Sequence, residues 1–353
     1  MDFDVLKDLV KTITRNKIKQ IEVLGNPGNE ESRTEELYHG IYTERFRSED
    51  EAAKHFFGSD EKDPNYRKLR NRLIRQLINT SFFIDVQQPM FNERARALCN
   101  CYRDYAACYV LRSRDAYKAS VYLLQQLLTQ TIKFEFTELS ADICRQLRQQ
   151  FSLSPGDQAN HDKFSELHRT YEDKRFWESK SYDYHENLIH HYITGRSNNL
   201  EVHKLAAQYY DELLSVAKEV DTMQFYAYTY TIGVLKYSSI SDCAKTIKLC
   251  DEALEVLQNR KFTNRGSLLS FGLQKMACLT QLRILDEEGQ KTVDFCLNLV
   301  EDGEYNWFRV LETQFYYCLY GSQYQEALQV FEKVIQHSRY TTLSGSTRDM
   351  WTM

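Results

Sequence analysis

The stretch from Asn306 to His337 reads NWFRVLETQFYYCLYGSQYQEALQVFEKVIQH and has the clearest structural pattern in the chain. Its first half has a helical pattern that ends at Gly321, and its second half is an amphipathic helix. Spacings of three and four residues place one set of apolar side chains on a common face: Ala327, Leu328, Phe331, Val334 and Ile335. A hairpin of this kind cannot bury its apolar face alone. We therefore expect other helices of the chain to pack against it.

The composition of the whole chain favours helices and gives no overall attraction to a polyanion. The 353 residues include 45 basic and 50 acidic side chains, for a formal net charge of −5. This balance does not draw the protein to nucleic acid or anionic lipid as a whole, although a local basic patch is compatible with it. Prolines are few, none follows Pro155, and glycines are sparse. Such sequence predicts an all-α fold.

The cysteines and the N-terminus bear on the compartment. Nine cysteines occur singly inside apolar helical patterns, and no CxxC pair is present. This usage predicts buried, reduced thiols in a cytoplasmic protein. The first ten residues, MDFDVLKDLV, carry acidic side chains where a secretory signal would carry basic ones. No apolar run approaches the roughly 20 residues that span a bilayer, so we expect no membrane partner.

Residues 1–88 are predicted to form a separate small helical module. An apolar helical face comes first, and the β-branched segment at 18–24 is suited to a short strand. A loop around Pro27 follows. Pro89 marks the predicted boundary, and residues 89–353 are predicted to form a solenoid of helical hairpins.

Two helix starts in this module have recognisable capping residues. Ser48 is a predicted N-cap, and Glu51 three residues later completes a capping box. This short helix should end at Gly58. Asp63 is the predicted N-cap of a longer helix with Pro64 at its first position.

The longer helix carries basic side chains at Arg67, Lys68, Arg72 and Arg75. A short helix, a turn and a long basic helix follow one another in the DNA-binding helix-turn-helix, so residues 48–84 are a candidate for nucleic-acid binding. The other interpretation is a solvated amphipathic helix whose basic face meets acidic neighbours. The connecting turn is longer than is usual for the motif. The acidic residues nearby, which would weaken attraction to phosphate, are Asp50, Glu51, Asp60, Glu61 and Asp63.

Beyond Pro89, helical patterns follow one another with short gaps. The approximate spans are 91–112, 115–133, 137–151, 159–175, 177–194, 200–219, 222–237, 240–259, 265–284, 287–301, 305–320 and 323–338. The last six spans form three pairs, and successive pairs are spaced by roughly 40 residues.

In the last pair, Tyr324, Ala327, Leu328 and Phe331 stand where the tetratricopeptide repeat has its turn tyrosine, small alanine, leucine and phenylalanine. Residues 200–353 therefore resemble the tetratricopeptide-like α-solenoids, and residues 91–199 are similar in period and composition. The chain departs from the strict repeat because Phe315 replaces the first-helix glycine and the closing proline is absent. The resemblance implies a scaffold that binds a protein or peptide.

The surplus of tyrosines in the first helices of the pairs indicates where a peptide would bind. A tyrosine whose ring packs and whose hydroxyl faces a groove is suited to that role. The candidates, chosen for polar or amphipathic character, are Tyr226, Tyr230, Gln274, Gln314 and Tyr317.

The sequence carries no motif that indicates catalysis. GxxxxGK[ST], GxGxxG, HExxH and GxSxG are all absent. Glu186 and His190 share a helix face without an evident third ligand, so we expect no metal and no cofactor. The sequence thus predicts a protein- or peptide-binding scaffold without catalysis. The alternative is a transcriptional regulator, similar to bacterial peptide-responsive regulators, in which residues 48–84 bind DNA and the solenoid senses a ligand.

The end of the chain looks like the start of one more helix. After a loop at 344–347, the sequence RDMWTM supplies apolar side chains but too few residues for a stable helix. We therefore expect either a truncated sequence or self-association through the C-terminal hairpin. Trp351 should be at least half buried against helix 325–336. If Phe331 is buried between helices, Phe331→Ala should cost about 3–5 kcal/mol.

Overall fold

The structure, a computed structural model, describes most of the chain. It describes residues 3, 6, 7, 10, 33–82, 84–87, 91–152, 157–194, 199–262, 264–284, 287–349 and 351. These residues form helices with short connections, and no strand occurs among them, so the all-α prediction is confirmed for this part. The predicted strand at 18–24, the loop around Pro27 and the predicted boundary at Pro89 lie outside the described residues.

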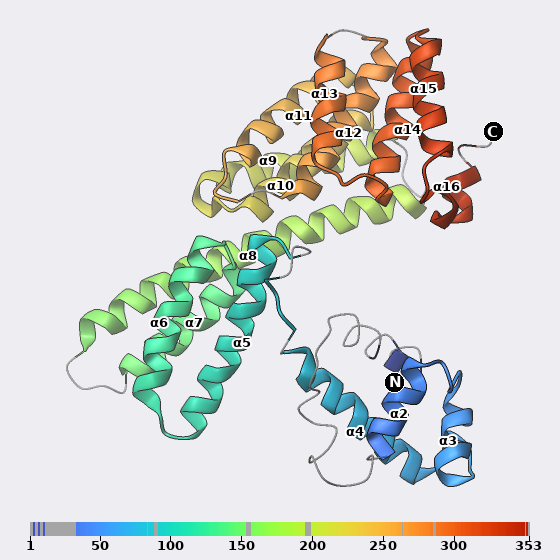
Figure 1. Cartoon of the computed structure of the whole chain (residues 1–353). Helices are drawn as coiled ribbons and strands as arrows, with labels where there is room; N and C mark the ends of the chain where they lie inside the picture. The colour runs from blue at the N-terminus through green and yellow to red at the C-terminus, as the bar shows by residue number, and fades with distance from the viewer. Residues whose placement is uncertain are drawn as a thin grey trace. The chain divides into compact units, whose positions relative to one another are not determined.

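The chain divides into two compact units, Met1–Ala107 and Cys108–Met353 (Figure 1). The division falls within helix α5 (Glu93–Ser113). In the N-terminal unit, α4 packs against both α2 and α3. The bounds of these helices are Arg33–Tyr42 for α2, Glu49–Phe57 for α3 and Pro64–Ser81 for α4. The core of this unit includes Leu6, Val10, Leu37, Ile41, Phe46, Ala52, Ala53, Tyr66, Leu69, Leu73 and Leu77.

Both predicted caps in the N-terminal unit are confirmed. The Ser48 hydroxyl accepts a hydrogen bond from the Glu51 amide at 3.2 Å. The Glu51 carboxylate reaches back to the amide of Arg47 at 2.7 Å, one residue before the N-cap. Asp63 caps α4 by accepting hydrogen bonds from two free amides of its first turn, at 2.7 and 3.1 Å. The capping residues therefore fix where α3 and α4 begin.

The C-terminal unit consists of consecutive helices that pack as neighbours. Their bounds are α6 (Tyr117–Lys133), α7 (Thr137–Ser152), α8 (Gln158–Thr194), α9 (Asn199–Val220), α10 (Met223–Ser238), α11 (Cys243–Gln258), α12 (Arg265–Leu282), α13 (Glu287–Asn298), α14 (Tyr305–Tyr320), α15 (Tyr324–Ile335) and α16 (Gly345–Asp349), with a 3₁₀ turn at Tyr340–Thr342. The predicted pairs are confirmed as α10 with α11, α12 with α13 and α14 with α15. Contacts of α11 with α12 and of α12 with α14 stack these hairpins into a helical solenoid.

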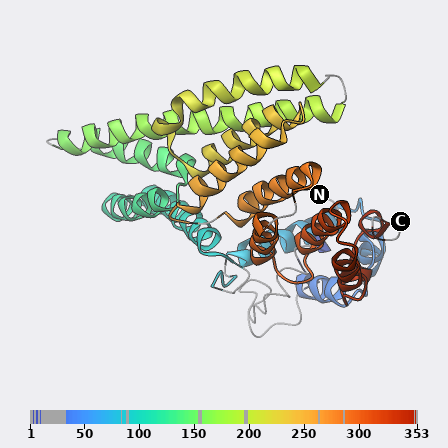
Figure 2. The same ribbon diagram turned by 90° about the horizontal axis from the view of Figure 1, so that it is seen from above.

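One helix assignment from the sequence is wrong. The spans 159–175 and 177–194 form a single helix, α8, of 37 residues. Neither glycine nor proline interrupts it, so the backbone has no reason to break at residue 176. α8 contacts α7, α9 and α10, and Figures 1 and 2 show it as the long light-green helix of this unit. It therefore connects the earlier helices to the solenoid hairpins.

A glycine permits close packing in the middle of the solenoid. A Cβ at Gly233 of α10 would lie 2.6 Å from the ring of Tyr210 and 2.7 Å from a methyl group of Leu249. These atoms belong to α9 and α11, so the absence of a side chain lets three helices meet at one point. Among the described residues, no helix is both long enough and apolar enough to cross a membrane.

Candidate functional site

The five residues predicted to line a peptide groove do not share one accessible surface. Tyr230 and Tyr317 are buried, with 8% and 4% of their surface exposed. Tyr226, Gln274 and Gln314 are partly exposed. Tyr230 and Tyr317 therefore offer little surface to a peptide, because neighbouring residues cover them. A binding role for the other three residues stays a prediction.

The surroundings of these side chains explain their burial. The ring of Tyr317 lies on Gly289 of α13, where a Cβ would come within 1.8 Å of the tyrosine oxygen. Tyr226 stacks on Tyr230 with ring centroids 6.2 Å apart, and the guanidinium of Arg260 lies 4.8 Å from the Tyr226 centroid. Local sequence shows neither the glycine opposite Tyr317 nor the arginine over Tyr226.

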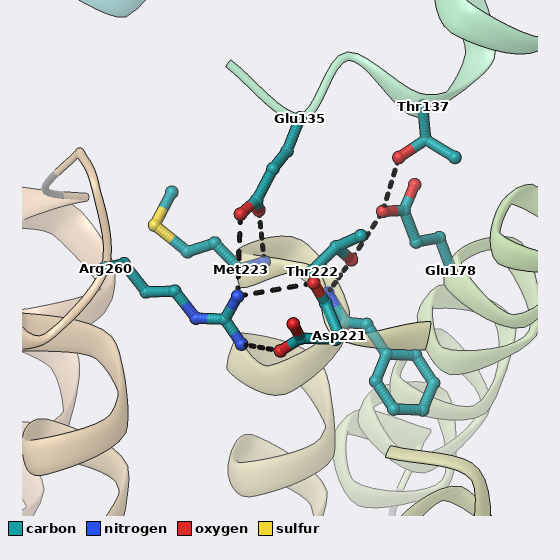
Figure 3. Close-up of polar contacts among 8 residues, drawn as sticks. Glu135, Thr137, Glu178, Asp221, Thr222, Met223 and Arg260 are labelled. Atoms are coloured by element: carbon teal, nitrogen blue, oxygen red, sulfur yellow. Dashed lines mark hydrogen bonds and ion pairs between the residues drawn. The ribbon is translucent and has the colours of Figure 1, made fainter. Parts of the chain in front are cut away.

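A buried polar network joins four elements of the C-terminal unit (Figure 3). The Glu178 carboxylate of α8 accepts hydrogen bonds from the hydroxyls of Thr137 at 2.8 Å and Thr222 at 2.6 Å. Thr137 begins α7, and Thr222 is the N-cap of α10, where it also accepts the Phe225 amide at 3.4 Å. Burial raises the pKa of Glu178, and the two threonine hydrogen bonds oppose that shift.

The same network continues through the turns between helices. Glu135, in the α6–α7 turn with a φ of 53°, accepts the Met223 amide at 2.6 Å and an Arg260 nitrogen at 3.5 Å. Arg260 follows α11 and donates to the Asp221 carboxylate at 2.6 Å and to its carbonyl at 3.3 Å. Figure 3 shows these side chains converging from separate turns. The network holds three hairpin turns against α8.

The side chains that form the Glu178 hydrogen bonds are all buried: Glu178, Thr137 and Thr222 are 7%, 3% and 3% exposed. The hydroxyls of Thr137 and Thr222 are donors to a carboxylate that is itself buried, so neither is presented to a substrate. Among the described residues, no group of three or more His, Cys, Asp or Glu side chains is arranged to hold a metal ion. Local sequence does not indicate the network, because Glu178 lies 41 residues from Thr137 and 44 residues from Thr222.

The basic residues of α4 lie where the sequence predicted, on the surface of the N-terminal unit. Arg67, Lys68, Arg72 and Arg75 are all exposed. Arg70 differs from them, because it is partly buried and pairs with Glu49 of α3 at 2.7 Å. The structure therefore separates one structural arginine from four cations that face solvent.

The last hairpin leaves an apolar face uncovered. α15 buries Ala327, Val330 and Val334 against its neighbours. Leu328 and Ile335, which the sequence placed on the buried stripe, are 55% and 39% exposed. That expectation is wrong for these two residues because the described helices cover only one side of α15. The exposed large apolar residues on this hairpin are Tyr305, Tyr316, Leu319, Tyr320, Tyr324, Leu328 and Ile335.

The C-terminal turn covers part of α15. Trp351 is 5% exposed, and its ring centroid lies 5.7 Å from that of Phe315 and 6.3 Å from that of Phe331. The prediction that Trp351 is at least half buried is confirmed. It belongs to a cluster with Trp307, Phe308, Leu311, Val330 and Val334.

Phe331 is partly buried beside Trp351 rather than enclosed between helices. We therefore expect Phe331→Ala to cost on the order of 2 kcal/mol, below the range for a fully buried ring. Urea denaturation of the full chain measures this cost. A loss of about 4 kcal/mol or more would contradict the half-buried position of the ring.

Two exposed surfaces are therefore candidates for binding. One is the cationic face of α4, and the other is the apolar face of the last hairpin. Comparisons of this chain with protein-family models, with curated proteins and with solved structures find no match.

Proposed function

We propose that this chain is a cytoplasmic helical scaffold that binds a partner protein through its last hairpin. The observation that carries the proposal is the apolar face of α14 and α15, on which Tyr320, Tyr324 and Leu328 are 57%, 65% and 55% exposed. Large apolar side chains gathered on one surface are typical of protein-binding sites. No catalytic role is included in the proposal.

The stacking of the preceding hairpins indicates the kind of partner. The second helix of each earlier pair has neighbours on both sides: α11 contacts α10 and α12, and α13 contacts α12 and α14. α15 contacts α14, while Tyr324 and Leu328 of α15 are exposed. Tyr324, Leu328 and Ile335 are four and seven residues apart, so they lie on one face of α15. A second helix can pack along such a face. We assign this place to an amphipathic helix of a partner protein.

Two further features support the proposal. All nine cysteines are free thiols, and all except Cys99 are buried, which fits a reducing compartment. The hairpin order and the Tyr324, Ala327, Leu328 and Phe331 pattern are similar to tetratricopeptide-like solenoids, which are binding scaffolds. The resemblance is strongest in the hairpin that leaves its outer face exposed.

Leu328→Asp should abolish partner binding without unfolding the solenoid, because the side chain is already exposed. A charge at this position would be desolvated under a docked helix, which opposes binding. Leu214→Asp is a matched control, since Leu214 is 47% exposed on α9. The measurement is affinity capture by the tagged full chain, with the captured protein then identified, purified and titrated.

A purified partner that binds the parent and Leu214→Asp equally, but not Leu328→Asp, supports the proposal. Equal binding by all three proteins would contradict it. Light scattering tests whether a second copy of this chain covers the hairpin instead. A dimer of the parent that Leu328→Asp dissociates would show that a second copy, rather than a different protein, covers this hairpin.

A further inference from the structure

α4 carries a continuous cationic face. Its 18 residues, PNYRKLRNRLIRQLINTS, contain no acidic side chain. At 100° per residue, Arg67, Lys68, Arg72 and Arg75 lie on the side opposite the buried Leu73. The same side carries three exposed amides, which are Asn65, Asn71 and Asn79.

Three acidic side chains near this face bond to groups other than its four exposed cations. One guanidinium nitrogen of Arg70 donates to both carboxylate oxygens of Glu49, at 2.7 and 3.0 Å. Asp50 accepts the backbone amide of Glu61 at 3.0 Å. Asp60 accepts the amide of Lys62 at 2.9 Å.

Of the three remaining carboxylates that the sequence placed nearby, Glu51 and Asp63 are the helix-capping groups of α3 and α4, and Glu61 lines a pocket together with Arg67. Within the described residues, none of the four exposed cations forms an ion pair. The acidic neighbours therefore form no direct ion pair with these four side chains, and Asp50 and Glu61 line a pocket with Arg67.

The arrangement also opposes helix stability. Lys68 and Arg72 are four residues apart, and Arg72 and Arg75 are three apart, so like charges face each other on adjacent turns. Neither pair has an interposed carboxylate on α4. A polyanion that bridges these side chains would remove the repulsion.

We infer that this face binds duplex DNA, with α4 lying in the major groove. The B-form major groove admits an α-helix, whereas the deep and narrow major groove of duplex RNA does not. Arginine and asparagine side chains read guanine and adenine edges there, and the remaining cations contact phosphates. α3 precedes α4 across the turn Gly58–Asp63, in the order of a helix-turn-helix. This surface belongs to the N-terminal unit, whereas the proposed partner site belongs to the C-terminal unit.

The test uses the full chain and a fluorescent random-sequence DNA duplex of about 25 base pairs, a length that exceeds two helical turns. Anisotropy is measured from low to moderate salt. With four phosphate contacts, the affinity should fall with a log–log slope of about −3.6, which is roughly 100-fold between 50 and 200 mM salt. A variant with Arg67, Lys68, Arg72 and Arg75 all replaced by glutamine should lose at least that much affinity at low salt.

A matched control removes the same charge from the other unit at exposed lysines, by changing Lys118, Lys204, Lys218 and Lys261 to glutamine. Retained DNA binding by this control, with loss in the α4 variant, supports the inference. Absence of binding by the parent at low salt would overturn it, as would equal binding by the parent and the α4 variant. Equal affinity for duplex RNA would overturn the major-groove assignment.

An acidic polypeptide distinguishes a protein partner from DNA at the same face. If polyglutamate displaces the duplex at an equal concentration of charge, the face is an acidic-protein site and the inference fails. Circular dichroism of each variant checks that the helices are retained. Partner capture by the α4 variant, assayed as for Leu328→Asp, should remain unchanged, so failure of one proposal is distinguishable from failure of the other.

Discussion

Trp351→Ala should lower the free energy of unfolding of the C-terminal unit by about 3–5 kcal/mol, the range for a buried aromatic side chain. Trp351 is 5% exposed and packs in a cluster with Trp307, Phe308 and Val334. Its removal would leave a cavity bounded by rings that cannot collapse fully into it. It would also expose Phe331, which the indole partly covers.

Urea denaturation of the full chain, followed by circular dichroism, measures this cost. Tyr320→Ala is the control, because Tyr320 is 57% exposed on the same hairpin and should cost within about 0.5 kcal/mol. A cost below about 1 kcal/mol for Trp351→Ala would mean that the indole is not packed in solution. A similar cost for both variants would mean that the whole hairpin, not the indole cluster, sets the stability.

The helices were largely predictable because their signals are local. The capping groups of Ser48 and Asp63 act within a few residues of their own position, so the sequence alone located the starts of α3 and α4. The predicted break at residue 176 has no glycine or proline behind it. Without either residue, α8 continues for 37 residues and contacts α7, α9 and α10.

Burial was harder to predict because it depends on neighbouring helices. Leu328 has the spacing of a core residue, yet it is exposed because its side of α15 has no covering helix among the described residues. Tyr317 has the amphipathic character of a binding residue, yet Gly289 on α13 gives its ring a buried place. In contrast, the cations of α4 were correctly placed on the surface, since the opposite face carries the leucines that form the core.

Two substitutions of Glu178 separate the effect of its charge from the effect of its hydrogen bonds on stability. Glu178→Ala should cost about 2–5 kcal/mol, because it leaves the hydroxyls of Thr137 and Thr222 without their acceptor, at about 1–3 kcal/mol each. Glu178→Gln should be at least as stable as the parent at neutral pH. Both hydroxyls donate to the same carboxylate oxygen, and an amide oxygen can accept them equally.

The pH dependence distinguishes burial of a charge from loss of a contact. Burial raises the folded-state pKa of Glu178 above its ordinary value of 4.5, whereas the unfolded chain keeps the ordinary value. As pH rises above about 4.5, the unfolded state releases this proton first, so the contribution of Glu178 to stability falls until the folded carboxyl also ionises. Glutamine does not titrate. The stability of Glu178→Gln relative to the parent should therefore increase with pH across this window and then level off.

Urea midpoints of the parent, Glu178→Gln and Glu178→Ala between about pH 3.5 and 8 test this expectation at about half-unit intervals, which are fine enough to resolve a titration. A constant difference between the parent and Glu178→Gln would mean that the carboxyl is solvated in the folded state. A fall in the relative stability of Glu178→Gln with rising pH would mean that hydrogen bonds to the ionised form outweigh its burial. If Glu178→Ala costs as little as Glu178→Gln, water accepts the hydrogen bonds of the two threonine hydroxyls. The hydrogen bonds to α8 would then not be what holds the starts of α7 and α10.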